Sequence, residues 1–179
     1  MGNNSFKNSF GARNSPIGDE RYTPPEAVAI ILPYIPDGSR VWCPFDTEDS
    51  WFAKLIREHG CEVIATHIRN GQDFFETDVD CDYIVSNPPF SKKTEIFRRL
   101  YEIGKPFAML CSLSGIFDHR GRWVMFRAHE PQLLIPNRRV HFMSPFSDVV
   151  EKNTPFQSAY VCERMLPKQI VFAEMRKDK

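Results

Sequence analysis

Short apolar runs alternate with segments of helical periodicity through most of this chain. The apolar runs lie at 40–43, 61–66, 83–86 and 106–113, and the clearest helical pattern, at 93–103, separates the last two. Strands that alternate with helices are typical of a mostly parallel sheet that is covered by helices on both faces. The sequence therefore predicts a three-layer α/β domain.

The two ends of this pattern complete the expected element order. Thr23-Pro24-Pro25-Glu26 places a hydroxyl before a proline-initiated helix, with an acid three residues later, which predicts a capped first helix. A second helix is expected at 50–59. The remaining strand candidates share the absence of a long helix between them, and they lie at 133–135, 140–143, 157–162 and 169–172. We therefore expect an antiparallel hairpin to finish the sheet.

The composition is that of one globular domain with a polar leading segment. With 42% hydrophobic residues in 179, the chain can bury a substantial core, and we assign residues 20–179 to a single domain. Residues 1–19 show no periodicity and are interpreted as a flexible tail. Phe6 and Phe10 are unusual in such a tail, and they suggest docking on a partner protein or on the domain itself.

Charge and cysteine usage exclude several classes of protein. Lys plus Arg equals Asp plus Glu at 23 each, so any contact with phosphates must come from a local patch. No stretch approaches the roughly 20 apolar residues that span a bilayer, and we expect a cytoplasmic protein with no membrane contact. The five cysteines form no CxxC pair and the histidines lack ligand spacing, so no metal site is predicted.

Asn87-Pro88-Pro89-Phe90 directly follows the apolar run at 83–86 and precedes the helical pattern at 93–103. An aromatic amine is a poor nucleophile because its lone pair is delocalised into the ring. The side-chain oxygen of Asn87 and a backbone carbonyl held rigid by the two prolines can accept both N–H hydrogens and localise that pair. Phe90 could stack on a base swung out of its duplex. The alternative is an ordinary strand-ending turn rich in Asn and Pro.

With these residues in order, the chain resembles the class I S-adenosylmethionine-dependent methyltransferases of the N6-adenine type, above all the compact phage and prophage enzymes. The similarity covers roughly residues 20–172. It implies a Rossmann-like three-layer fold, S-adenosylmethionine as cofactor, and adenine in DNA as the target. Asn87, Pro88, Pro89 and Phe90 match the catalytic motif of that family.

The resemblance also implies where the cofactor would bind. Segment 21–24 is similar to the family segment that lines the methionine end of the cofactor, and segment 72–75 to the one that holds its adenine. One difference stands out, because the loop after the first strand contains no glycine and the acid usual after the second strand is replaced at 66–67. The residues assigned to the cofactor are Tyr22, Thr23, Pro44, Phe45, Asp46, His67, Asp73, Phe74 and Asn87.

Basic residues interleaved with aromatic ones flank the motif. Such a pattern suits attraction to a nucleic-acid backbone together with base stacking, whereas the alternative is a solvated helix face and loop. Phe142, in a late strand similar to those of the phage enzymes, is assigned to the target base. The residues assigned to the substrate are Phe90, Lys92, Lys93, Arg120, Arg122, Trp123, Arg139 and Phe142.

The expected reaction is transfer of a methyl group from S-adenosylmethionine to N6 of an extruded adenine, without a metal. The same tetrapeptide also serves enzymes that methylate RNA bases or a protein glutamine, so these acceptors remain open. A second class is a methyltransferase-like fold that acts as a non-catalytic binding or inhibitor module, which the glycine-free loop and the tail favour. A nucleotide-binding dehydrogenase is excluded, since no GxGxxG follows a strand.

Overall fold

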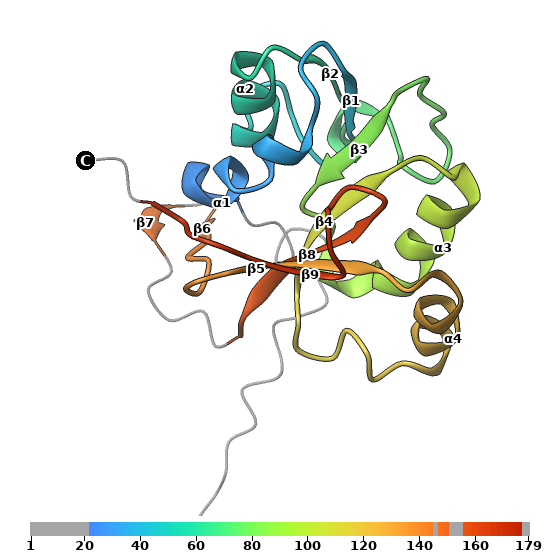
Figure 1. Ribbon diagram of the computed structural model, residues 1–179. Helices are drawn as coiled ribbons and strands as arrows, with labels where there is room; N and C mark the ends of the chain where they lie inside the picture. Colours follow the sequence, from blue (N-terminus) through green and yellow to red (C-terminus); the bar gives the residue numbers. More distant parts are fainter. Residues whose placement is uncertain (1–21, 145–146, 151–155, 177–179) are drawn as a thin grey trace, which may run out of the picture.

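The computed structural model describes residues 22–144, 147–150 and 156–176 (Figure 1). The side chains of residue 90 and of residues 144–150 are outside this description. The expectations for the tail at 1–19, including a partner that binds through Phe6 and Phe10, fall on residues outside the described part.

A mixed sheet forms the centre of the described chain. Its strand order is β2-β1-β3-β4-β8-β5-β9, and every neighbouring pair is parallel except the two pairs that involve β8. The strands are β1 (Arg40–Cys43), β2 (Glu62–Ala65), β3 (Tyr83–Ser86), β4 (Phe107–Ser112), β5 (Gln132–Pro136), β8 (Ser158–Glu163) and β9 (Ile170–Ala173). The expected mostly parallel α/β fold is confirmed.

The antiparallel part of the sheet differs from the expected terminal hairpin. β8 runs against both β4 and β5 and lies between them, and β9 pairs with β5 in the parallel direction. The last two strands are therefore not neighbours. A local hairpin is found instead between β6 (Met143–Ser144) and β7 (Ser147–Val150), which form a separate two-stranded sheet. The strand expected at 140–143 contributes only its last residue.

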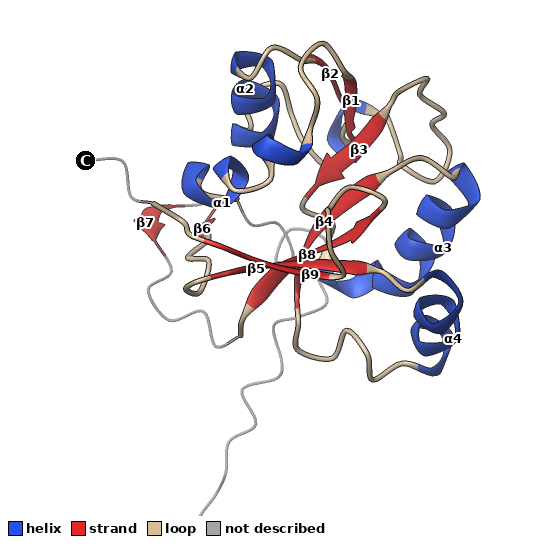
Figure 2. Cartoon of the chain, in the orientation of Figure 1, coloured by secondary structure: helices blue, strands red, loops and turns tan. Residues whose placement is uncertain are grey.

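Helices cover both faces of the sheet (Figure 2). One buried cluster joins the sheet to α1 (Pro25–Ala29) and α2 (Trp51–Glu58), and the other joins it to α3 (Lys93–Ile103) and α4 (Arg120–His129). The short 3-10 turns are η1 (Leu32–Tyr34), η2 (Ile68–Asn70) and η3 (Phe90–Lys92). No helix among the described residues has the length and apolar character needed to cross a membrane.

Side chains alternate between the two faces of the sheet along each strand, and so they contribute to the two clusters in turn. Val41 and Cys43 belong to the α1/α2 cluster, whereas Trp42 between them belongs to the α3/α4 cluster. Every residue of β4 is buried, as expected for a strand covered on both faces. The sheet is therefore the middle of three layers, which is the predicted architecture.

The capping residues at the helix ends act as their sequence suggests in α2 and α3 but not in α1. Ser50 accepts a hydrogen bond from the Ala53 N–H and caps α2, and Gly104, at φ +71°, ends α3 in the left-handed conformation. The cap of α1 differs from the expectation, because Pro24 occupies the N-cap position and no side chain caps the helix. The hydroxyl of Thr23 is buried and makes no hydrogen bond within the described residues.

All five cysteines are buried, and each lies in one of the two clusters or at its margin. Burial raises the pKa of the Cys43 and Cys81 thiols, so both are neutral at physiological pH. The cysteines therefore pack as small apolar side chains. Within the described residues, no three His, Cys, Asp or Glu side chains converge as a metal site would require.

Candidate active site

The carboxyl ends of the parallel strands meet at one edge of the sheet. Cys43 pairs with Ala65, and Ser86 pairs with Met109, so β1, β2, β3 and β4 run in register toward this edge. Asn87 is the first residue after β3 and is half-buried, with its Oδ1 atom below the surface. Ligands of open α/β sheets bind at this position, beyond the carboxyl ends of the strands.

The two prolines hold the chain rigidly beyond Asn87. Pro88 is buried, and Pro89 has φ −58° and ψ 138°, after which the chain enters η3 and then α3. The order of strand, motif and helix predicted from the sequence is therefore confirmed. Because proline has no N–H and a fixed φ, the carbonyl groups of this segment are held in place before any ligand arrives. The side chain of Phe90 lies outside the described residues.

Asp46 connects the loop after β1 to the strand that carries Asn87. Its carboxylate accepts a hydrogen bond of 2.5 Å from the hydroxyl of Ser86, the residue directly before Asn87. The Asp46 N–H donates to the carbonyl of Thr66 at 3.2 Å, at the end of β2. Asp46 is 8% exposed, and this burial raises the pKa of its carboxyl to about 7, although hydrogen bonds from Ser86 and Ser50 act in the opposite direction. Through its carboxylate and its backbone N–H, Asp46 thus links the loop after β1 to the ends of β3 and β2.

The raised pKa of Asp46 predicts a pH-dependent stability. Between its ordinary value of 3.8 and about 7, the folded protein keeps a proton that the unfolded chain releases. The contribution of Asp46 is therefore fully present below pH 3.8 and is lost as the pH rises through about 7, by up to about 4 kcal/mol. Asp46→Asn retains an acceptor for Ser86 and should remove this loss. Urea unfolding of both proteins at several pH values measures the difference.

Asp49→Asn, in the same loop but exposed, is the matched control for that prediction. The difference in unfolding free energy between wild type and the control should stay constant with pH. If the wild type and Asp46→Asn show parallel pH profiles from pH 4 to pH 8, Asp46 does not titrate as its burial implies.

Aromatic side chains gather beside the loop after β1. The ring of Phe74 lies 4.9 Å from that of Phe45 and 5.4 Å from those of Trp42 and Phe75, measured between centroids. Phe74 is only 2% exposed, so it packs as part of the core. Asp73, which was expected to bind the cofactor, is half-buried and its Oδ1 accepts a hydrogen bond from the Phe75 N–H at 3.0 Å.

Phe75 belongs to this group, and the sequence analysis did not assign it to the site. It is only partly buried, and the ammonium group of Lys92 lies 5.5 Å from its ring centroid. Two adjacent phenylalanines carry no pattern that tells which one is covered, so no signal in the sequence separates Phe75 from Phe74. The structure brings Lys92, beside the motif, against Phe75.

The residues after β2 are engaged by the protein itself. The indole N–H of Trp42 donates to the hydroxyl of Thr66 at 2.8 Å, and Nδ1 of His67 accepts from the Arg69 N–H at 3.1 Å. His67 is 9% exposed and caps η2. Both side chains stabilise the turn after β2, where the methyltransferases that this sequence resembles have an acid.

Two buried hydroxyl groups, one before α1 and one on β8, make no hydrogen bond within the described residues. One is Oγ1 of Thr23, next to Tyr22, which is 44% exposed and forms a two-residue bridge with Met143. The other is Oγ of Ser158, which pairs with Ser112 at the end of β4. Buried polar groups usually have partners, so each hydroxyl is a candidate contact for a polar ligand.

Arg122 was expected to contact the substrate, and the structure corrects this interpretation. Its guanidinium donates to the carbonyls of Ile116 and Gly115 at 2.8 and 2.7 Å and to the hydroxyl of Thr94 at 2.6 Å. These bonds tie the segment after β4 to α3. Three of the five N–H donors of Arg122 are therefore bonded to the protein itself, which holds this side chain against the fold.

The other basic and aromatic residues differ in their accessibility. Lys92 is exposed, whereas Lys93 is 9% exposed and its ammonium lies 3.4 Å from the carbonyl of Ser112. Trp123 is 53% exposed, and the guanidinium of Arg127 lies 5.4 Å from its ring. Arg120 and Arg139 are exposed as well. An exposed aromatic-basic surface thus exists on α4, outside the motif itself.

Phe142 was assigned to the target base, and this assignment is wrong for the described structure. Its side chain is 0% exposed and belongs to the cluster under α1 and α2. A ring enclosed by core residues offers no face on which a base can stack. The alternation along a strand candidate at 140–143 did not show which face Phe142 takes, because that segment is not a regular strand.

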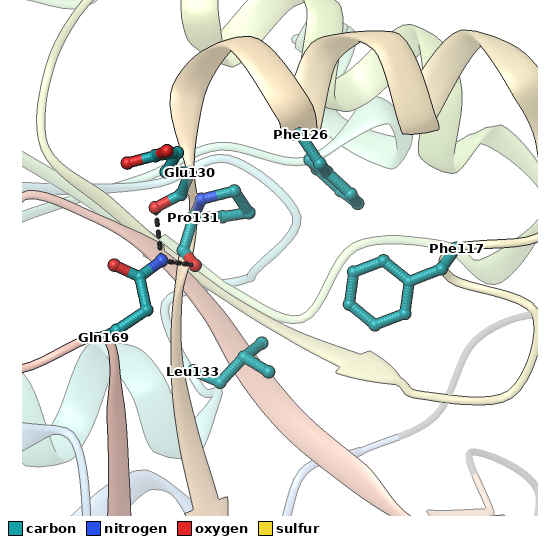
Figure 3. Close-up of a pocket in the computed structure, with 6 residues that line it drawn as sticks. All are labelled: Phe117, Phe126, Glu130, Pro131, Leu133 and Gln169. Atoms are coloured by element: carbon teal, nitrogen blue, oxygen red, sulfur yellow. Dashed lines mark hydrogen bonds between the residues drawn. The ribbon is translucent and has the colours of Figure 1, made fainter.

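A pocket lies away from the motif, on the α4 side of the sheet (Figure 3). Glu130 and Pro131 lie between α4 and β5, and Leu133 lies in β5. The side-chain amide of Gln169, before β9, donates to the carbonyls of Glu130 and Pro131 at 2.6 Å. Phe117 and Phe126 complete the lining. Because the amino ends of β5 and β9 lie opposite the carboxyl edge, this pocket is not part of the Asn87 site.

No protein-family model matches the chain, and no protein of curated function matches it either. Among solved structures, the chain is similar to a modification subunit of a candidate type I restriction enzyme from Vibrio vulnificus YJ016, with a TM-score of 0.56, 12% identity, and coverage of 92% of this chain and 49% of that one. A second similar structure, the methyltransferase subunit of a type I restriction-modification system from Streptococcus thermophilus, has a TM-score of 0.48, 10% identity, and coverages of 89% and 49%.

The chain spans about half the length of both of these subunits. At such low identity the likeness establishes the fold alone. The fold is a methyltransferase-like α/β arrangement.

Proposed function

We propose that this chain transfers a methyl group from S-adenosylmethionine to N6 of adenine in DNA. The observation that carries the proposal is the position of Asn87, directly after β3 at the carboxyl edge of a methyltransferase-like sheet and followed by two prolines. An Asn oxygen and a fixed carbonyl can accept both hydrogens of an amine and turn its lone pair toward an electrophile. The role is one of positioning and electrostatic stabilisation.

Several residues carry groups that fit the cofactor. The buried hydroxyls of Thr23 and Ser158 would gain partners from a polar ligand, and Phe75 supplies a partly open aromatic face. Asp73 and Tyr22 retain exposed surface for the same purpose. S-adenosylmethionine, when bound, would supply the electrophilic methyl group.

DNA as the substrate is supported by two observations. The similar structure from Vibrio vulnificus is a modification subunit of a candidate type I restriction enzyme. In this chain, Lys92 beside the motif and the Trp123–Arg127 pair on α4 offer cationic and aromatic surface. A swung-out adenine would place its exocyclic amine at Asn87, while basic residues contact the backbone.

Titration calorimetry with S-adenosylmethionine tests the proposal first. We expect saturable binding at one site, which weakens when Phe75→Ala removes the open aromatic face, whereas Trp123→Ala on α4 leaves it unchanged. Labelled cofactor with separate DNA, RNA and protein pools then identifies the acceptor, and we expect label in DNA. Label in RNA or in a protein glutamine would correct the acceptor while preserving the role of Asn87.

One observation favours a second candidate, a non-catalytic binding module. Pro44 and Asp46 are buried, and Phe45 packs on Phe74, so the glycine-free loop after β1 is filled by the protein's own side chains. A chain that has lost its cofactor site would show no heat of binding at any concentration of S-adenosylmethionine. That result would favour the binding module over the enzyme.

A further inference from the structure

β9 forms one edge of the seven-stranded sheet in the part of the chain that the structure describes. Val171 and Ala173 face inward and pack against the core, whereas Ile170 and Phe172, on the opposite face, are 49% and 79% exposed. Edge strands are usually protected by charge, by proline or by a covering segment. β9 instead presents two large exposed apolar side chains.

The backbone of β9 has a defined set of groups directed away from the sheet. The carbonyls of Gln169 and Ala173 accept hydrogen bonds from the N–H groups of Leu133 and Asn137, so these residues point toward β5. Because the direction of backbone groups alternates along a strand, the N–H and C=O groups of Ile170 and Phe172 point outward. These are the groups that an added strand would bond.

The sequence of β9 is complementary to itself in the antiparallel direction. With Val171 on a two-fold axis, Ile170 of one copy faces Phe172 of the other, and each of these pairs exchanges both outward backbone hydrogen bonds. In the same register the exposed Lys168 faces the exposed Glu174. Apolar side chains thus face apolar side chains, and a positive charge faces a negative one, all on the same face of the strand.

Neighbouring registers lack this complementarity. An axis at Phe172 brings Lys168 opposite Arg176 and Ile170 opposite Glu174, and an axis at Ile170 brings Lys168 opposite Phe172. An axis between two residues pairs outward groups with inward ones and forfeits hydrogen bonds. The register centred on Val171 is therefore the favoured one.

We propose that β9 is a homodimerisation edge, on which a second copy of this chain adds its own β9 in the antiparallel direction and extends the sheet across a two-fold axis. β4, β8 and β5 separate β9 from β3 in the sheet, so the edge that carries Asn87 stays open in the dimer. This interface is independent of the proposed methyl transfer.

Sedimentation velocity of the full chain over a concentration series tests the interface. We expect a concentration-dependent monomer-dimer equilibrium, which Phe172→Lys shifts to monomer. Val124→Lys, at another exposed apolar site on α4, should leave this equilibrium unchanged. A wild-type chain that remains monomeric at its highest soluble concentration, or a Phe172→Lys variant that dimerises like the wild type, overturns the proposal.

Charge reversal tests the register. Lys168→Glu alone or Glu174→Lys alone places like charges opposite each other twice in each homodimer and should weaken association roughly tenfold. Mixing the two single variants should produce a heterodimer with both pairs restored, and the double variant should associate like the wild type. If mixing yields no more dimer than either variant alone, the register is wrong and the proposal falls with it.

Discussion

Replacing Asn87 by alanine is expected to lower the rate of methyl transfer by at least about 100-fold while S-adenosylmethionine still binds. The variant removes the side-chain acceptor but leaves the rigid Pro88-Pro89 segment and the surrounding strand ends in place. The loss should appear in kcat more than in KM, because the interaction strengthens as the amine changes geometry. Single-turnover transfer of labelled methyl to DNA measures the rate, and calorimetry measures the cofactor affinity.

Asn137→Ala is the matched control for this experiment. Asn137 lies after β5, far along the sheet from β3, and its side chain accepts one hydrogen bond from the Met175 N–H. The control should lose about 1 kcal/mol of stability and keep its activity at temperatures where it is folded. An Asn87→Ala enzyme that methylates at the wild-type rate would refute the proposed role of the carboxamide.

Phe97→Ala is expected to cost about 3 to 5 kcal/mol of folding free energy. Phe97 is 0% exposed, and its ring lies 5.1 Å from that of Phe126 on α4 and 6.0 Å from that of Phe107 on β4. The substitution therefore opens a cavity where two helices meet the sheet. Because whole domains are stable by only about 5 to 15 kcal/mol, this single change threatens the fold.

Urea unfolding measures this second effect as a shift of the midpoint at constant slope. Trp123→Ala removes an even larger aromatic side chain, but one that is 53% exposed, and it should change stability by about 0.5 kcal/mol or less. A Phe97→Ala variant as stable as Trp123→Ala would mean that the α3/α4 face is not packed as described.

Several elements follow directly from local sequence patterns. The strands at 40–43 and 83–86 and the helix at 93–103 coincide with β1, β3 and α3, because each has a complete apolar pattern and a clear stop signal such as Gly104. α4 was not predicted as a helix. Its exposed face carries Trp123 and Val124, so apolar residues lie all around it and no clean stripe marks it.

The candidate site likewise contains features that the local sequence predicts and features that it does not. Asn87 could be placed at a strand end from the order of its neighbours in the sequence. The hydrogen bond from Arg122 to Thr94, which is 28 residues away, could not be predicted. It depends on how the segment after β4 folds back onto α3. The same is true of the bond between Ser86 and Asp46, whose residues are 40 positions apart.

The sequence by itself determined that this chain builds a helix-covered, mostly parallel sheet and that Asn87, Pro88 and Pro89 follow one of its strands, because periodicity, turn residues and caps act over a few neighbouring positions. Only the tertiary structure decided that β8 enters reversed between β4 and β5, that Phe142 is enclosed in the core, and that β9 remains at the edge. Those outcomes depend on which distant apolar surfaces bury one another, and such contacts between distant residues leave no periodic trace in a single sequence.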